Sequence, residues 1–283
     1  MLNAQNVLLQ KPYGTTWINY TRCHDDIGLG YDDNMIEAAG YNAYAHRNFL
    51  KEYYSGSFDG SPSKGALFSS NPKTGDARIS GSLASLCGLE KAVEDNDEEA
   101  IKISIKKILL MQAHSFFLGG IPMIFYGDEA AYTNDYSYLD DTGKSYDNRW
   151  MHRPLIDWNK NNRIQLNGTI EHLVFNSTKR LIELRHALSI VADHKNLTWL
   201  TPHNIHVSGY LRSYEDRRLF CIFNFHARPA WLTWYTFKEY GIKPIKLFDH
   251  WSEEMYTVGA DNEYFILEPY TFYLLQPAEW ESQ

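Results

Sequence analysis

Cysteine is scarce in this sequence, and its scarcity removes two classes of protein. The three cysteines, Cys23, Cys87 and Cys221, lie far apart, and none belongs to a CxxC or CxxxC pair. This number and spacing argue against a disulfide framework, leave a zinc site without support and fit a reducing compartment. The acidic region 128–166 has no EF-hand spacing either, so no metal and no other cofactor is predicted.

The sequence also lacks a basic cluster and a long uninterrupted apolar segment, and these two absences limit the kinds of partner that we expect. The chain has 27 basic against 35 acidic residues, a net charge of −8, and no dense lysine and arginine cluster. A nucleic-acid partner is therefore not expected. The most apolar stretch, residues 108–127, is interrupted by Gln112, His114, two glycines and Pro122, which favours a buried helix followed by a buried strand over a membrane span. The N-terminus lacks the basic start and long apolar region of a signal peptide, so we expect a cytoplasmic protein with no membrane partner.

The sequence does contain enough apolar material for a packed core, in one large domain or two modest ones. Hydrophobic residues make up 44% of the 283 positions, and aromatic residues make up 15%. Residue type and spacing predict strands over 15–23 and 121–126, and helices over 34–54 (interrupted near Gly40), 82–92, 98–118 and 168–190. Regions 55–81 and 128–166 are predicted to be long irregular loops, which are usually functional.

The pattern changes after Asp193. From there apolar and polar residues alternate between turn signals, which is typical of antiparallel strands with one solvated face. The earlier order of strand, long helices and buried strand indicates α/β architecture instead. We therefore expect a domain boundary near residue 195.

A histidine and two aspartates directly follow the first predicted strand. His24, Asp25 and Asp26 ("HDD") would lie at the C-terminal end of a parallel strand, where barrel folds gather their active-site groups. A capping aspartate or a surface turn explains the same run from spacing alone, because a short motif has a high false-positive risk.

The order of four longer segments favours the functional interpretation. "INYTRCHDDIG", "FDGSPSKGALFSSNPKTGDARISG", "GGIPMIFYGDE" and "DNRWMHRPLIDW" together resemble the C-terminal half of amylosucrase-type enzymes in glycoside hydrolase family 13, the α-amylase family. The resemblance covers nearly the whole chain and weakens after about residue 195. It implies an α/β fold: the C-terminal portion of a (β/α)8 TIM barrel in residues 1–194, then a small antiparallel β-sandwich domain in residues 195–283. The predicted strands 15–23 and 121–126 would be barrel strands seven and eight, with an inserted subdomain at about residues 30–80.

The resemblance also implies roles for five residues. His24 and Asp25 resemble the pair that holds the glucosyl ring and stabilises the oxocarbenium-like transition state, so they are the candidate catalytic residues. Asp26 and Arg78 resemble the residues that contact the fructosyl unit of sucrose. Arg149 resembles the arginine that closes the glucose pocket with an aspartate from early in the barrel. An ordinary surface ion pair is the alternative for either arginine.

Two neighbouring carboxylates, Asp128 and Glu129, suggest acid/base catalysis at first sight. The corresponding pair in the resembled family supports loop structure, and we expect the same role here. The family's nucleophile and acid/base carboxylates lie on strands four and five, which resemble nothing in this chain. We therefore expect a C-terminal part of a longer enzyme or one half of a split enzyme, inactive alone, with the missing N-terminal half of the barrel as its partner.

Three functions follow from this resemblance. The first is part of a retaining, amylosucrase-like glucosyltransferase that uses sucrose to extend an α-glucan. The second is a sucrose hydrolase or α-glucosidase of the same family. The third is a non-catalytic module that binds glucan or maltooligosaccharide or serves in assembly.

Overall fold

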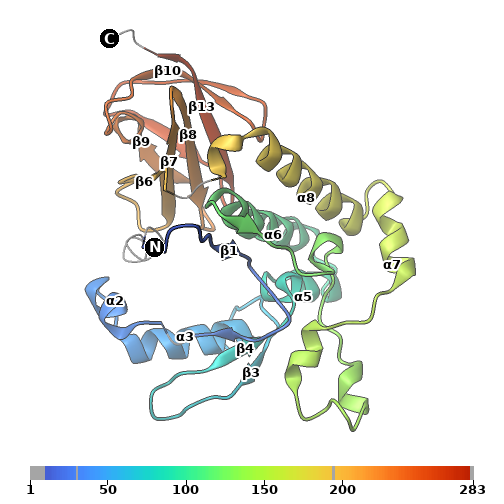
Figure 1. The fold of residues 1–283 in the computed structure, drawn as a ribbon. Helices are drawn as coiled ribbons and strands as arrows, with labels where there is room; N and C mark the ends of the chain where they lie inside the picture. Colours follow the sequence, from blue (N-terminus) through green and yellow to red (C-terminus); the bar gives the residue numbers. More distant parts are fainter. Residues whose placement is uncertain (1–9, 30, 193–194, 281–283) are drawn as a thin grey trace. The chain divides into compact units, whose positions relative to one another are not determined.

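The computed structural model describes residues 10–29, 31–192 and 195–280, which form parts of two compact units (Figure 1). The first unit comprises residues 1–19, 110–123 and 179–283, and the second comprises residues 20–109 and 124–178. Helices α6 (Glu98–Phe117) and α8 (Ile170–Ala187) each continue from one unit into the other. No helix in the described ranges is long and apolar enough to cross a membrane. Most of the N-terminal stretch that bears on a signal peptide, residues 1–9, lies outside the described residues.

Antiparallel strands dominate the first unit, as the alternating pattern after Asp193 predicts. A six-stranded sheet has the order β11-β10-β13-β8-β7-β6, and β9 pairs with β12 in a second sheet. The strands are β6 (Leu197–Trp199), β7 (Val207–Tyr214), β8 (Arg217–Asn224), β9 (Ala230–Thr233), β10 (Pro244–Asp249), β11 (Met255–Thr257), β12 (Tyr264–Leu267) and β13 (Phe272–Trp280). Short 3₁₀ helices, η6 (Ser189–Val191) and η7 (Trp234–Phe237), precede β6 and follow β9.

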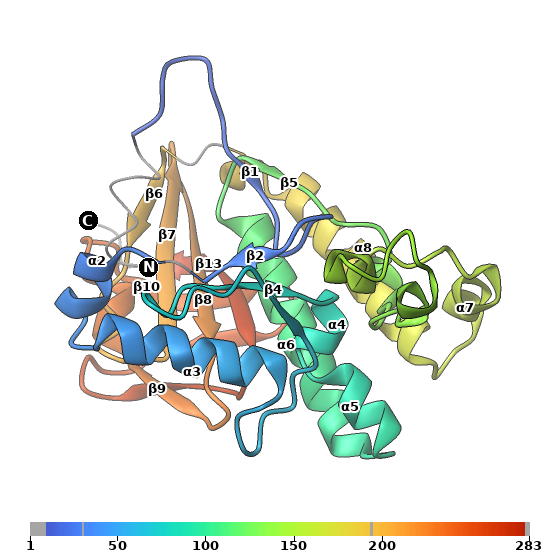
Figure 2. The ribbon, with the colours of Figure 1, turned by 90° about the horizontal axis from the view of Figure 1, so that it is seen from below.

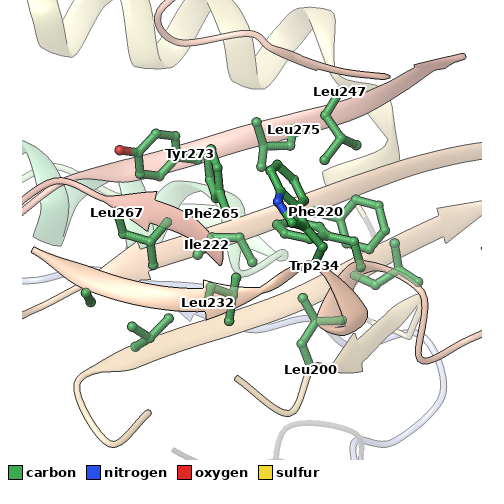
Figure 3. Close-up of a cluster of buried hydrophobic side chains, with 14 residues drawn as sticks. Leu200, Phe220, Ile222, Leu232, Trp234, Leu247, Phe265, Leu267, Tyr273 and Leu275 are labelled. Carbon is green, nitrogen blue, oxygen red and sulfur yellow. The ribbon is translucent and has the colours of Figure 1, made fainter. Parts of the chain in front are cut away.

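The core of this β-sandwich lies between the two sheets (Figure 3). Leu232 of β9 and Phe265 of β12 pack with Phe220 and Ile222 of β8 and with Leu275 of β13. Each of these side chains is at most 5% exposed. Burying one such side chain stabilises the fold by about 1.5–3 kcal/mol, so the alternation of apolar residues is sufficient to hold the sheets together.

The two strands predicted as barrel strands are shorter than expected. Parallel strands β1 (Ile18–Asn19) and β5 (Ile121–Pro122) pair over two residues each, and Ile18 and Ile121 remain 59% and 56% exposed. Burial was predicted for the strand over 121–126, and the exposure of Ile121 contradicts that prediction. Among the described residues each of the two strands has a single partner. Gly120 permits the pairing, because a Cβ there would lie 2.4 Å from the backbone oxygen of Trp17.

The second unit contains a three-stranded antiparallel sheet that the sequence did not predict. β4 (Arg78–Ser80) lies between β2 (Ile27–Gly28) and β3 (Ala66–Phe68), and both β3 and β4 fall inside the region 55–81 that was predicted to be irregular. Its strands have two or three residues, too few to show a periodic pattern. Helix α3 (Ala43–Ser55) lies beside β3 and β4 (Figure 2), and its Leu50 and Tyr54 pack against the buried cluster of Leu29, Ile79 and Leu86.

In the helices of this unit the predicted break near Gly40 is confirmed, whereas a second break, at Gly88, was not predicted. The predicted helix 34–54 forms α2 (Asp33–Ala38) and α3 (Ala43–Ser55), with Gly40 at a φ of 86° between them. The predicted helix 82–92 forms α4 (Leu83–Leu86) and α5 (Leu89–Glu94), separated at Gly88. The loop predicted over 128–166 contains η2 (Asp128–Ala130), η3 (Ser137–Asp140), η4 (Asn148–His152), α7 (Trp158–Asn162) and η5 (Arg163–Gln165).

Candidate functional site

Three of the predicted residues lie close together in the second unit, with His24 and Arg149 both near the carboxylate of Asp25. His24 Nε2 lies 3.3 Å from Asp25 Oδ2, and Arg149 Nη1 lies 3.4 Å from Asp25 Oδ1. Arg153 places its Nη2 3.4 Å from the same Oδ1. The side chains of His24 and Asp25 are 70% and 50% exposed, so a ligand can reach both from solvent.

Arg149 is oriented mainly by Asp147, two residues earlier in the chain. Its Nε and Nη2 donate to the Asp147 carboxylate at 2.9 and 2.8 Å, and the backbone N–H of Arg149 donates to the same side chain at 3.0 Å. These bonds lower the pKa of Asp147 and raise that of Arg149. The resemblance implied an aspartate from early in a barrel as the partner of Arg149, and within the described residues Asp147 and Asp25 pair with it.

Asp26 and Arg78 form a separate ion pair with each other. Arg78 extends from β4, whose register pairs it with Gly28, two residues after Asp26. Its Nη1 lies 3.3 Å from Asp26 Oδ2. The Asp26 side chain is 2% exposed whereas that of Arg78 is 59% exposed. In this arrangement Arg78, and not Asp26, faces solvent.

Sequence reasoning missed the residues that support the pair of His24 and Asp25 from behind. Arg153 Nε donates to the backbone oxygen of His24 at 2.7 Å, and His152 Nε2 lies 3.2 Å from that oxygen. Both residues, and Asp147, belong to the quoted segment "DNRWMHRP", in which only Arg149 was singled out. The signal that could have found them is the unusual density of charged and imidazole side chains in eight residues.

A buried arginine, Arg22, lies two residues before His24 in the chain. Arg22 is 1% exposed, and none of its three guanidinium nitrogens has a hydrogen-bond partner among the described residues. Burial raises the pKa of Asp128 to about 7, an effect that nearby Arg22 opposes and Glu129 reinforces. Glu129 accepts a hydrogen bond from the backbone N–H of Gly127 at 2.8 Å, which fits the loop-supporting role expected for it.

This arrangement suits a neutral, polyhydroxylated ligand. An exposed carboxylate accepts hydrogen bonds from hydroxyl groups, and the adjacent imidazole and guanidinium groups donate them. Such bonds to ring hydroxyls contribute to transition-state stabilisation in glycoside hydrolysis. Among residues 10–29, 31–192 and 195–280, no cluster of three or more His, Cys, Asp or Glu side chains is placed to hold a metal ion.

Known proteins resemble the chain at the level of structure. No protein-family model matches it. A variant of AmyP in complex with maltotriose aligns with 63% of this chain at a TM-score of 0.51 and 13% identity. An Anoxybacillus alpha-amylase aligns with 72% (TM-score 0.46, 15% identity), and a MutB double mutant in complex with isomaltulose aligns with 61% (TM-score 0.45, 19% identity). The matches cover 36%, 37% and 38% of those longer chains.

The likeness to AmyP shows the fold, because 13% identity is too low to transfer an activity. The chain is α/β, the C-terminal portion of a (β/α)8 barrel followed by an antiparallel β domain, as the sequence predicted. It spans little more than a third of the length of the protein it matches.

Proposed function

We propose that this chain supplies part of the sugar-binding site of an α-amylase-family enzyme that acts on sucrose or an α-glucan. The observation that carries the proposal is the half-exposed Asp25 carboxylate, with His24 on one oxygen and two arginines on the other. In the finer assignment the enzyme is amylosucrase-like: it forms a glucosyl-enzyme from sucrose with retention, releases fructose and extends an α-glucan.

Each predicted residue has a role in this proposal. His24 and Asp25 bind the glucosyl hydroxyls and stabilise positive charge as it develops on the ring. Arg149 closes the glucose pocket, and its bidentate bond to Asp147 fixes the orientation of the planar guanidinium. Arg78 faces the leaving fructosyl unit, with Asp26 orienting its guanidinium.

The chemistry requires carboxylates beyond those proposed here. A retaining enzyme needs a nucleophile and an acid about 5–5.5 Å apart, flanking the scissile bond. We propose that a partner half of the barrel supplies both, that residues 1–194 belong to the catalytic barrel, and that residues 195–283 form the C-terminal domain. This chain alone is then expected to bind sugar without turnover, and hydrolysis of sucrose above the rate of a variant lacking His24 and Asp25 would contradict that expectation.

The direct test is calorimetric titration of the chain with sucrose and with maltotriose. Asp25→Asn removes the charge that strengthens hydrogen bonds to hydroxyls, so we expect roughly 10-fold weaker binding. Asp59→Asn is the matched control, because Asp59 is an exposed aspartate of the same unit. Equal affinities for both variants and the wild type, or no binding at all, would refute the proposal.

The ratio of released fructose to free glucose distinguishes glucosyl transfer from hydrolysis. With the complementary half present, an amylosucrase-like enzyme releases more fructose than free glucose, whereas equal amounts indicate a sucrose hydrolase. Saccharide binding that never leads to turnover, even with that half present, indicates a glucan-binding module.

A further inference from the structure

His152 is a deeply buried side chain next to the candidate site, and the proposed function does not use it. It ends the 3₁₀ helix η4 and is 1% exposed. Its ring lies between two segments that are distant in sequence: the backbone of His24 on one side and that of Gly81, which follows β4, on the other. An imidazole in this position connects three parts of the second unit.

The two backbone partners determine where the imidazole carries its proton. The N–H of Gly81 lies 3.2 Å from His152 Nδ1, and a backbone N–H can only donate, so Nδ1 must be unprotonated. The carbonyl oxygen of His24 lies 3.2 Å from His152 Nε2, and a carbonyl can only accept, so Nε2 must carry the proton. One neutral tautomer therefore satisfies both partners, and the cationic ring would place an N–H against the N–H of Gly81.

We propose that His152 is a positioning residue, a neutral imidazole protonated at Nε2 that holds the His24 peptide in place and thereby aims the side chains of His24 and Asp25. Arg153 completes the clamp, because its Nε donates to the same His24 oxygen at 2.7 Å. Two donors on one carbonyl leave that peptide little freedom to rotate. The tautomer assignment stands on the hydrogen bonds alone, whereas the consequence for sugar binding rests on the proposed function.

The charges around the ring agree with a neutral imidazole. Burial, reinforced by the nearby cations Arg22 and Arg153, lowers the pKa of His152 to about 3. The hydrogen bond to the His24 carbonyl and the charge of Asp147 act in the opposite direction but are weaker. The ring thus stays neutral across the range in which an ordinary histidine titrates, near pH 6.5.

Long-range ¹H–¹⁵N correlation spectra of the imidazole rings test the tautomer without any activity assay. We expect an unprotonated Nδ1 and a protonated Nε2 for His152, unchanged from about pH 7 to pH 5. The spectrum of a His152→Gln variant identifies the signal. A protonated Nδ1, or a titration step near pH 6.5, would overturn the proposal.

Three variants test the positioning role through saccharide titration. His152→Leu removes both hydrogen bonds, and we expect roughly 10-fold weaker binding of sucrose or maltotriose. His152→Gln can accept from Gly81 and donate to His24, so it should restore most of the affinity. Met151→Ala, at a neighbouring buried position in η4, controls for general loosening of the turn and should bind like the wild type.

The outcomes separate this inference from the proposed function. Equal weakening by His152→Leu and Met151→Ala would show that His152 supports the turn without positioning the site. If the wild-type chain binds no saccharide, the proposed function fails, and the spectra still decide the clamp on their own. If the spectra show the other tautomer while saccharide binds normally, the clamp fails and the proposed function stands.

Discussion

Replacing Glu90 with glutamine should loosen the loop that leads to the candidate site, at a measurable cost in stability. The side chain of Glu90 is 7% exposed, and it accepts hydrogen bonds from Ser85 Oγ at 2.5 Å, Tyr136 Oη at 2.7 Å and Lys64 Nζ at 2.8 Å, and from the backbone of Asn134 at 3.2 Å. It therefore connects α5 to the segment after η2 that continues to Arg149 and His152. Glutamine has the same shape but no charge.

The expected loss of unfolding free energy depends on how well the Lys64 charge remains compensated after the substitution. Breaking a buried ion pair by removing one partner costs about 3–5 kcal/mol, because the other charge is left uncompensated. The Lys64 side chain, however, is 30% exposed and keeps Glu94 at 2.6 Å. Although partial burial lowers the pKa of Lys64, its bonds to Glu90 and Glu94 raise it above the usual value. The main loss is the charge that strengthens the hydrogen bonds to Glu90, together with one accepting position that the glutamine NH2 group cannot fill, so we expect roughly 2–3 kcal/mol for Glu90→Gln.

Urea unfolding followed by circular dichroism measures this difference, with Glu94→Gln as the matched control. Glu94 pairs with the same lysine but its side chain is 55% exposed, and exposed pairs contribute about 0–1 kcal/mol. A double-mutant cycle with Lys64→Met should give a coupling energy of roughly 1–2 kcal/mol between Lys64 and Glu90. The reasoning is refuted if Glu90→Gln costs no more than Glu94→Gln.

Acid should destabilise the fold over a defined range, because burial lowers the pKa of His114 to about 4 and that of His152 to about 3, whereas it raises that of Asp128 to about 7. Between about pH 6.5 and pH 4 unfolding lets two histidines take up protons and one aspartate release its proton, so the free energy of unfolding should fall by about 1.4 kcal/mol per pH unit on acidification. Urea midpoints that rise as the pH falls through this range would contradict the assignment. Alkylation gives a separate test: at about pH 8, iodoacetamide should modify the half-buried Cys23 well before Cys221, which is fully buried and whose pKa burial raises to about 12. Peptide mass mapping reads this order, and equal rates for the two cysteines would exclude it.

Short-range patterns in the sequence predicted the long helices and the antiparallel strands. Helix α6 (Glu98–Phe117) lies within one residue of the predicted range at its end, and the break between α2 and α3 falls at Gly40. The antiparallel strands of the first unit followed from alternation, since Leu232 and Phe265 face the core while neighbouring residues of their strands are exposed. Each of these predictions depends on residues close together in sequence, where periodicity reports directly on burial.

Only some residues of the candidate site could be predicted from the sequence. The segments that carry His24, Asp25, Asp26, Arg78 and Arg149 could be recognised, and the structure groups His24, Asp25 and Arg149 around one carboxylate. The support provided by Arg153 and His152 could not be, because each contacts the backbone of His24, more than a hundred positions away. A hydrogen bond to a carbonyl leaves no trace in the identity of the accepting residue.

The sequence by itself determined where the long helices form and that antiparallel strands follow residue 195, because both depend on residue type and short-range spacing, and its resemblance to a known family indicated the candidate sugar-binding side chains. Only the tertiary structure decided how those side chains are held. The two-residue pairing of β1 with β5 and the short sheet of β2, β4 and β3 consist of backbone hydrogen bonds between distant segments. The clamp on His24 consists of hydrogen bonds from distant side chains to a backbone carbonyl. Such bonds form once folding brings the segments together, and residue order alone does not specify which carbonyl meets which donor.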